Sequence, residues 1–382
     1  MDFQKILDKV EPQVLSVAVV NLDNVAYNYH KVQEELAKDS IVSAVVKGNS
    51  YGFGAVPISR RLYKEGCRNF FVATINEGIE IRNTLPYEDV KIFVLSGVFK
   101  DTEDILLKYN LIPVLNNWNQ SDLWLQKARD LKKKLEVIVH VDTGMSRNGF
   151  MEEDEVHSSK DILDNLNLLF VMSHLACADD VSSEMNKKQL DRFKLALKRF
   201  GNPPACLSAT NGIFLGKDYQ FDMVRPGKSI YGFSIREDMI GIVKPVMDIF
   251  SRIVQVNHLK KGDTVGYGST FVASRDMTSV TLGIGYSDGF MRKFSGFGCG
   301  FLGEKKLPMI GRISMDYITL DASEVDEKYL KQGNWVALTH SPDYTIEKWA
   351  LDLGTIPHEV TCRLGSRVVK IYVDDCGGIL SE

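Results

Sequence analysis

The chain of 382 residues has little of what several protein classes require. Its six cysteines include no CxxC pair, so we expect reduced thiols and no metal site. No apolar stretch approaches the ~20 residues of a membrane helix, and the first ten residues do not form a signal peptide. A net charge of −4 offers no basic face to nucleic acid. We therefore expect a cytoplasmic protein that binds a small molecule and has no nucleic-acid or membrane partner.

Short apolar runs alternate with amphipathic segments between about residues 13 and 235, as in repeated βα units around a parallel sheet. One such segment, 183–200, ends at Gly201 and is predicted to be a helix. Eight runs within one such span favour a (β/α)8 barrel over an open sheet. The runs are 15–20, 42–46, 70–73, 92–95, 112–114, 137–141, 168–172 and 205–208.

The pattern changes after about residue 240. Short β-rich runs at 253–256, 279–284, 318–320 and 335–338 are separated by Gly, Asp and Ser. The predicted fold class is therefore α/β, with an N-terminal (β/α)8 TIM-type barrel over residues 1–240 and a C-terminal, mainly β domain over residues 241–382.

Polar residues that follow the barrel strands are the first candidates for function, because barrel enzymes carry their active sites at the carboxyl ends of the strands. Lys47 directly follows the run 42–46, and three glycines lie within the next seven residues. A lysine at the barrel mouth, with apolar neighbours that lower its basicity, is suited to form an imine with an aldehyde cofactor. A solvated lysine at the start of a loop is the alternative.

Further strand ends carry weaker signals. Arg147 is able to bind a carboxylate with its two-pronged guanidinium, and backbone amides near Gly227 are able to hold phosphate oxygens. His174 ends another strand, where a structural histidine is the commoner explanation. In the β-rich half Tyr267 and Tyr286 lie between glycines, where a tyrosine usually serves only packing.

Taken together and in this order, these segments resemble the alanine racemase family across nearly the whole chain. The resemblance rests on the residues around Lys47 and Tyr51 and on the segments DTGMSR (142–147), SHLACADD (173–180), VRPG (224–227), GYGST (266–270), GIGYSDG (283–289) and GRISMD (311–316). It implies a homodimeric isomerase that uses pyridoxal 5'-phosphate to interconvert L-alanine and D-alanine. D-Alanine biosynthesis supplies a peptidoglycan precursor.

The resemblance also implies roles for single residues. Lys47 holds the cofactor and exchanges the substrate's alpha proton on one face, while Tyr267 of the partner subunit acts on the other face. Two acid–base groups on opposite faces allow reprotonation from either side, which is racemisation. The remaining implied residues are Tyr51, Arg225, Asn211, Gly212, Gly227, Lys228 and His358 for the cofactor, Arg147, Met315 and Tyr286 for the substrate, and His174 and Asp316 in support.

The sequence departs from the family pattern at five of these or neighbouring positions. His140 stands where many relatives carry a lysine that becomes carbamylated, and His358 stands where a tyrosine is common. Phe53 and Ser208 each replace a histidine, and Gly212 replaces a phosphate-binding serine. These changes leave open a racemase for another amino acid, serine or a basic one, and also a non-catalytic cofactor-binding relative.

Two other enzyme classes share this barrel. A decarboxylase needs a Cys-Glu-Ser type segment in the C-terminal half, which the sequence lacks. A metal-dependent aldolase or dehydratase for D-amino acids needs a histidine–cysteine pair, for which His358 and Cys362 are the candidates. The residues that flank them resemble the racemase motif instead.

Overall fold

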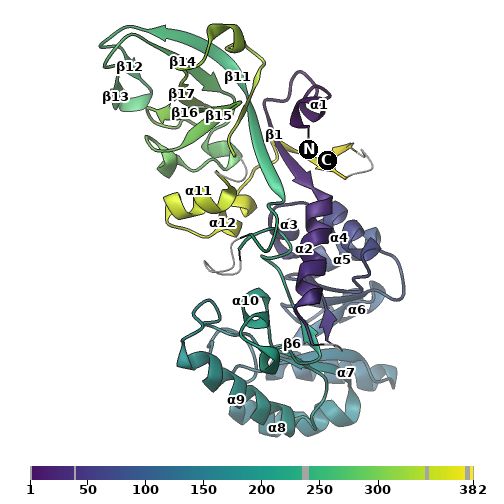
Figure 1. Ribbon diagram of the computed structural model, residues 1–382. Helices are drawn as coiled ribbons and strands as arrows, with labels where there is room; N and C mark the ends of the chain where they lie inside the picture. The colour runs from purple at the N-terminus through teal and green to yellow at the C-terminus, as the bar shows by residue number, and fades with distance from the viewer. Residues whose placement is uncertain (1, 38–39, 235–240, 340–343, 375–378, 382) are drawn as a thin grey trace. The chain divides into compact units, whose positions relative to one another are not determined.

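The computed structural model describes residues 2–37, 40–234, 241–339, 344–374 and 379–381, and the chain divides into two compact units (Figure 1). One unit is Val25–Lys244. The other joins Met1–Asn24 to Pro245–Glu382. Helix α2 (Leu22–Glu34) begins in the second unit and continues into the first.

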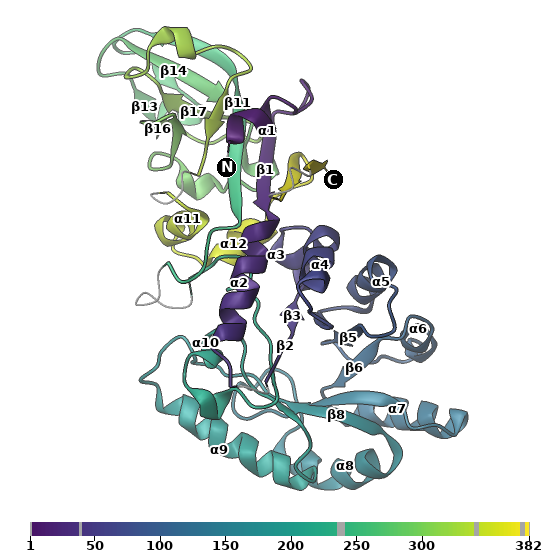
Figure 2. The ribbon, with the colours of Figure 1, turned by 45° about the vertical axis from the view of Figure 1, so that its right-hand side comes forward.

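The unit Val25–Lys244 is a parallel barrel with helices on its outer side (Figure 2). Strands β3 to β9 pair in chain order, and β10 (Met223–Val224) pairs with β2 (Ile41–Val42), which continues into β3 (Ala44–Val45). The ring closes through hydrogen bonds such as that from Arg225 N to Ser208 O at 2.8 Å. The other strands are β4 (Asn69–Val72), β5 (Lys91–Val94), β6 (Ile112–Leu115), β7 (Glu136–His140), β8 (Asn167–Met172) and β9 (Ala205–Cys206). The helices between them are α4 (Ala55–Lys64), α5 (Ile75–Thr84), α6 (Glu103–Lys108), α7 (Trp118–Leu131), α8 (Glu152–Asn165), α9 (Glu184–Arg199) and α10 (Thr210–Ile213).

The barrel interior is filled by inward-facing side chains from its strands, as in a packed core rather than a pore. Buried residues of strands β3 to β10 take part, and the ring centroids of Phe71 and Phe93 lie 4.7 Å apart. Helix α9 begins after Ser183 and ends at Arg199, which confirms the helix predicted over 183–200. This rigid interior fixes the strand ends from which the predicted site residues project.

The prediction that residues 15–20 form a barrel strand is wrong. Strand β1 (Ser16–Asn21) pairs antiparallel with β11 (Met247–Leu259) and parallel with β19 (Val368–Val373), both in the other unit. Its residues are almost all buried, and such continuous apolar runs are also typical of parallel barrel strands. The eighth barrel strand is instead β10, whose two residues are too few to give a periodic signal.

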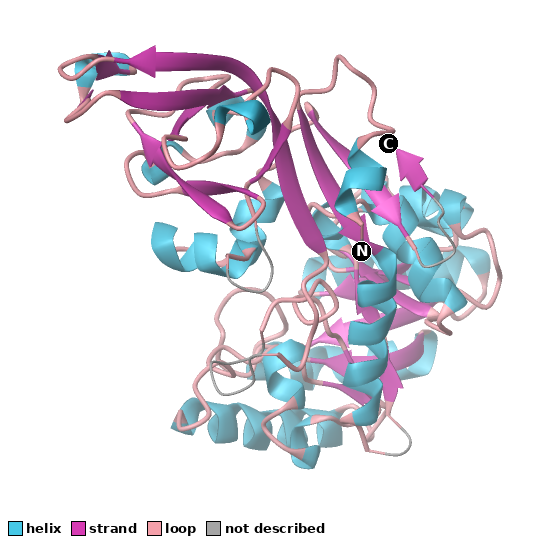
Figure 3. Ribbon diagram, turned by 45° about the horizontal axis from the view of Figure 1, so that its top comes forward, coloured by secondary structure: helices cyan, strands magenta, loops and turns pink. Residues whose placement is uncertain are grey.

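The second unit is dominated by antiparallel strands, as predicted (Figure 3). Its sheet runs in the order β14-β17-β16-β15-β18-β11, closes through β11–β14 pairing, and extends from β11 through β1 and β19 to β20. The bounds are β12 (Thr264–Val265), β13 (Phe271–Val272), β14 (Met277–Leu282), β15 (Cys299–Leu302), β16 (Lys305–Ile310), β17 (Ile318–Asp321), β18 (Trp335–Ala337) and β20 (Ile379–Ser381), with helices α1 (Phe3–Leu7), α11 (Ile346–Leu353) and α12 (Pro357–Cys362).

Two general expectations concern the whole chain. Among the described residues, no helix is both long and apolar enough to cross a membrane. The five described cysteines are free thiols, and Cys376 lies outside the described residues.

Replacing a barrel-core side chain should destabilise this unit strongly. Ile138 is fully buried on β7, so Ile138→Ala removes apolar contacts and leaves a cavity, at a cost of about 2–5 kcal/mol in the free energy of unfolding. Leu195→Ala on the exposed side of α9 is the matched control and should change it by less than about 0.5 kcal/mol. Urea unfolding followed by tryptophan fluorescence measures both, and equal effects would contradict the packing described here.

Candidate active site

Lys47 follows strand β3 at the barrel mouth and begins a turn with an unusual backbone. The φ angles of residues 48–51 lie between 52° and 62°, so the chain makes a short left-handed turn. Such a conformation costs an L-residue about 1–2 kcal/mol, and it persists only where its surroundings hold it. Lys47 and Tyr51 are therefore fixed at the two ends of a strained and tightly determined segment.

Glu77 on α5 is one of the groups that hold this turn. Its Oε1 accepts the N–H of Gly48 at 2.8 Å, and its Oε2 accepts the N–H of Ala73 at 2.7 Å. Thr74 and Glu77 also form a capping box at the start of α5. One carboxylate thus joins the residue after Lys47 to the end of the neighbouring strand.

Tyr51 is held by aromatic packing. Its ring stacks on Tyr231 at 4.8 Å, and Phe53 stacks on the same tyrosine at 5.1 Å. The Tyr51 hydroxyl lies so close to Gly227 that a Cβ at Gly227 would come within 2.5 Å of it. A side chain at this position would require the phenol to move.

Arg225 is buried at the same mouth and is bonded through both terminal nitrogens. Nη1 donates to the carbonyl oxygen of Cys206 at 2.8 Å and lies 2.9 Å from its Sγ, while Nη2 donates to Ser173 O at 2.6 Å. Nη2 also lies 3.4 Å from Nδ1 of His174. Among the described residues, no acceptor lies at the Nε–H of Arg225, so this donor remains available.

Two histidines beside Arg225 are held neutral. Burial, and then the charges of Arg225 and Arg147, lower the pKa of His140 to about 3, and the same causes lower the pKa of His174 to about 3. Nδ1 of His140 lies 2.8 Å from Oδ1 of Asn116, whose amide nitrogen donates to strand carbonyls. His140 therefore donates through Nδ1 and keeps the lone pair on Nε2.

Arg147 lies on a short loop that is closed at its base. Phe150 N donates to His140 O at 2.8 Å, and the Asp142 carboxylate accepts two amides within the loop. The guanidinium of Arg147 is exposed, and within the described part of the chain it makes no ion pair. This arginine is available to an anionic ligand.

The segment 208–212 lies next to Arg225 in the barrel. The Ser208 hydroxyl donates to Tyr219 O at 2.7 Å, and a Cβ at Gly212 would lie 2.6 Å from that hydroxyl. Ser208 thus turns away from Arg225 and fills the space that a larger residue 212 would need. Oδ1 of Asn211 is buried with no hydrogen-bond partner among the described residues.

The backbone near Gly227 already makes hydrogen bonds within the protein. Gly227 N donates to Thr210 Oγ1 at 3.1 Å, and Thr210 Oγ1 also lies 3.2 Å from the hydroxyl of Ser229. Lys228 is half-buried beside them. These groups form a polar cluster at the start of α10.

The other predicted residues lie in the second unit. Tyr267 begins a turn between β12 and β13, flanked by Gly266 and Gly268 with φ angles of 76° and 74°, and its side chain is 69% exposed. Tyr286 and Met315 lie on two loops joined by backbone hydrogen bonds, and Asp316 pairs with Arg367 at 2.7 Å.

His358 is half-buried on α12, and Cys362 at the end of that helix is exposed. In the described chain no cluster of three or more His, Cys, Asp or Glu side chains is arranged to hold a metal. A cavity of about 800 Å³ in the second unit, lined in part by Trp335 and Tyr329, contains none of the predicted residues.

Comparison with known families accounts for both units. Residues 20–235 match the family model "Alanine racemase, N-terminal domain", and residues 246–372 match "Alanine racemase, C-terminal domain". The chain belongs to the alanine racemase family. Alanine racemase from Rickettsia africae is 39% identical over 94% of this chain and 99% of its own length, and that from Brucella abortus is 36% identical over 95% and 94%.

Solved structures of the family agree with the fold. A crystal structure of alanine racemase from Bartonella henselae with covalently bound pyridoxal phosphate has a TM-score of 0.88 and 35% identity, and it covers 94% of this chain and 99% of that one. Alanine racemase from Clostridium difficile 630 has a TM-score of 0.88 and 28% identity, with 98% and 99% covered. The predicted family and the predicted combination of a TIM-type barrel with a mainly β domain are confirmed.

The sequence analysis missed several residues that shape the barrel mouth of this family member. Glu77 carried a detectable signal, because Thr74 and Glu77 have capping-box spacing before an apolar helix. Cys206 and Asn116 carried none, since a thiol at a strand end and an asparagine after a strand are common. Their contacts with Arg225 and His140 depend on which strands become neighbours.

The neutral histidines predict a pH dependence of stability. A histidine whose folded pKa lies near 3 binds its proton only in the unfolded chain between about pH 3 and 6.5, so stability falls as pH falls through this range. The contribution is about 1.4 kcal/mol per pH unit for each such histidine. His140→Asn should flatten the dependence of the unfolding free energy measured from pH 7 to pH 5.

The matched control is His258→Asn, at an exposed position on β11, which should keep the wild-type pH profile. A parallel shift of the whole curve in His140→Asn, without a change in slope, would show that His140 is not buried in its neutral form.

Proposed function

We propose that the protein is a pyridoxal-phosphate-dependent alanine racemase that interconverts L-alanine and D-alanine by a two-base mechanism. The observation that carries the proposal is Lys47, held at the mouth of the barrel on a left-handed turn that the rest of the site supports. Full-length relatives described as alanine racemases support the same activity.

The residues at the barrel mouth fit this cofactor. Lys47 follows strand β3 at its carboxyl end, and the two terminal nitrogens of Arg225 are bonded to protein acceptors, which leaves its Nε–H for a ring nitrogen. The Tyr51 hydroxyl lies against Gly227, and Oδ1 of Asn211 is a buried acceptor without a partner in the described chain. A family member from Bartonella henselae is described with covalently bound pyridoxal phosphate.

When bound, pyridoxal phosphate withdraws electrons from the substrate's alpha carbon and so acidifies its proton. Lys47 Nζ removes or returns that proton on one face, and the hydroxyl of Tyr267 of the partner subunit does so on the other. Arg147 binds the substrate carboxylate. Tyr51 and backbone amides of residues 227–228 bind the phosphate.

The charges at the barrel mouth suit an anionic ligand. Arg147 and Arg225 carry guanidinium groups, while His140 and His174 stay neutral because burial, and then these guanidinium charges, lower their pKa. A guanidinium at the cofactor ring keeps the ring nitrogen unprotonated, because a proton there would place two cations side by side. A cofactor ring held beside this guanidinium would withdraw less charge from the alpha carbon, which would favour simple proton return over side reactions.

The proposed assembly is a homodimer in the cytoplasm that supplies D-alanine for peptidoglycan. Tyr267 supports the shared site, because a catalytic tyrosine that is 69% exposed on a glycine-flanked turn is available to a second subunit. Tyr286, Met315 and Asp316 belong to the same unit as Tyr267, and we assign them to the same shared face.

A racemase for serine or a basic amino acid is the second candidate. It is favoured by His140, since a neutral histidine in contact with Asn116 replaces a residue that is anionic after modification in many relatives. A cofactor-binding protein without activity remains the third.

The two-base assignment predicts the behaviour of two variants. In deuterated buffer with pyridoxal phosphate, the wild type should exchange the alpha proton of L-alanine and lose optical rotation. Lys47→Ala should abolish both, and Tyr267→Phe should slow racemisation by roughly 100-fold or more because one of the two acid–base groups is lost.

Tyr329→Phe, at an exposed position of the same unit, is the matched control and should behave as wild type. Inert alanine with rapid turnover of serine or lysine would overturn the substrate assignment. Cofactor binding without exchange of any amino acid would favour the non-catalytic protein.

A shared site predicts complementation. Lys47→Ala and Tyr267→Ala should each be inactive as pure proteins, yet a refolded equal mixture should recover about a quarter of the wild-type activity. Half of the dimers are then hybrids, and each hybrid retains one intact pair of Lys47 and Tyr267. Recovery of no activity, with mixed dimers present by mass spectrometry, would mean that each site uses its own chain.

A further inference from the structure

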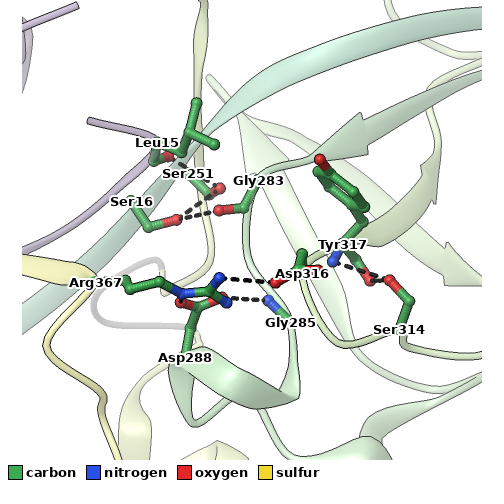
Figure 4. A network of polar contacts seen from close by, with 10 residues as sticks. All are labelled: Leu15, Ser16, Ser251, Gly283, Gly285, Asp288, Ser314, Asp316, Tyr317 and Arg367. Atoms are coloured by element: carbon green, nitrogen blue, oxygen red, sulfur yellow. Dashed lines mark hydrogen bonds and ion pairs between the residues drawn. The ribbon is translucent and has the colours of Figure 1, made fainter. Parts of the chain in front are cut away.

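Arg367 stands at the meeting point of three segments in the second unit (Figure 4). Its Nε and Nη2 bind the two carboxylate oxygens of Asp288 at 2.7 and 3.0 Å, and its Nη1 binds Oδ1 of Asp316 at 2.7 Å. We call these three side chains the Arg367 clamp. The two-pronged contact to one carboxylate and the third bond to another require the planar guanidinium, which a lysine cannot replace.

The carboxylate that Arg367 binds most closely, that of Asp288, is almost completely buried. The side chain of Asp288 is only 5% exposed, and its Oδ2 also accepts the N–H of Gly285 at 2.8 Å. The carbonyl oxygen of Asp288 accepts Gly365 N at 3.1 Å, so the segment before Arg367 is fixed to the same turn. A buried carboxylate without its cation is costly, so this turn depends on Arg367.

The two loops that the clamp joins carry Tyr286 and Met315. Tyr286 N donates to Ser314 O at 3.1 Å, and Ser287 N donates to Met315 O at 3.0 Å. The loops approach so closely that a Cβ at Gly285 would lie 2.3 Å from Met315 O. Their backbones are therefore fixed together, although the side chains of Tyr286 and Met315 are 43% and 52% exposed.

We propose that Arg367 is a positioning residue that sets the size of the substrate side chain accepted by the enzyme. The inference rests on the proposed function, in which Tyr286 and Met315 line the substrate space. Arg367 touches neither the substrate nor the cofactor. It acts by holding Asp288 and Asp316, which follow Tyr286 and Met315 in sequence, at a fixed distance.

The test compares Arg367→Lys with wild type in two measurements. Hydrogen exchange with mass spectrometry should show faster exchange in peptides that cover 283–289 and 312–317, because the amides of these loops lose their fixed acceptors. The ratio of kcat/KM for alanine to that for serine should fall roughly tenfold, mainly through KM, while kcat for alanine changes less than about threefold.

Two further variants make the test specific. Asp316→Asn keeps the paired contact of Arg367 with Asp288, so it should fold and show a smaller change of the same kind. Arg275→Lys alters an exposed arginine whose Nη2 lies 3.7 Å from Asp321 in the same unit, and it should change neither measurement.

Faster exchange with an unchanged alanine-to-serine ratio would overturn the inference, because Arg367 would then be structural only. So would unchanged exchange in both loops. If the wild type racemises no amino acid, the proposed function fails and the inference fails with it. If the wild type is active but Arg367→Lys leaves its alanine-to-serine ratio unchanged, only the inference fails.

Discussion

Burial of the Arg225 guanidinium is the constraint on which the barrel mouth depends. A buried cation is costly unless hydrogen bonds compensate for its lost hydration, and the ends of β8 and β9 supply acceptors to its two terminal nitrogens through Ser173 O and both the carbonyl and Sγ of Cys206. These contacts fix three neighbouring strand ends relative to one another. Burial, and then this charge, lower the pKa of His140 and His174, so both histidines serve as neutral hydrogen-bonding groups.

A second constraint is the left-handed turn after Lys47. Its strain is offset by local bonds and by Glu77, whose carboxylate caps α5 with one oxygen and holds Gly48 with the other. The Glu77 side chain thus both caps α5 and holds the turn that places Lys47. The glycines in this segment follow from backbone geometry, since Gly52 and Gly54 have φ angles of 86° and 100°.

The barrel was predictable because its parallel strands come from continuous apolar runs, and these runs alternate along the chain with amphipathic helical segments. The assignment of residues 15–20 failed because β1 is buried on both faces in a different sheet, and local sequence does not encode which strands become partners. For the same reason Lys47 was recognisable at a strand end, whereas Cys206 and Arg367 were not. A thiol behind a guanidinium and an arginine between two aspartates become visible only when distant segments meet.

Several of the residues expected to depart from the family pattern lie against one another or against residues of the site. Ser208 donates to Tyr219 O and thereby occupies the space in which a side chain at position 212 would lie, so a serine at 208 and a glycine at 212 fit together. Cys206 then supplies an acceptor to the Arg225 terminus that Ser208 does not reach. Phe53 likewise packs on Tyr231, the same ring on which Tyr51 stacks, and so supports Tyr51 indirectly. These contacts place the supports of Tyr51 and Arg225 on neighbouring segments, so a change at one of them alters the site without replacing a cationic group.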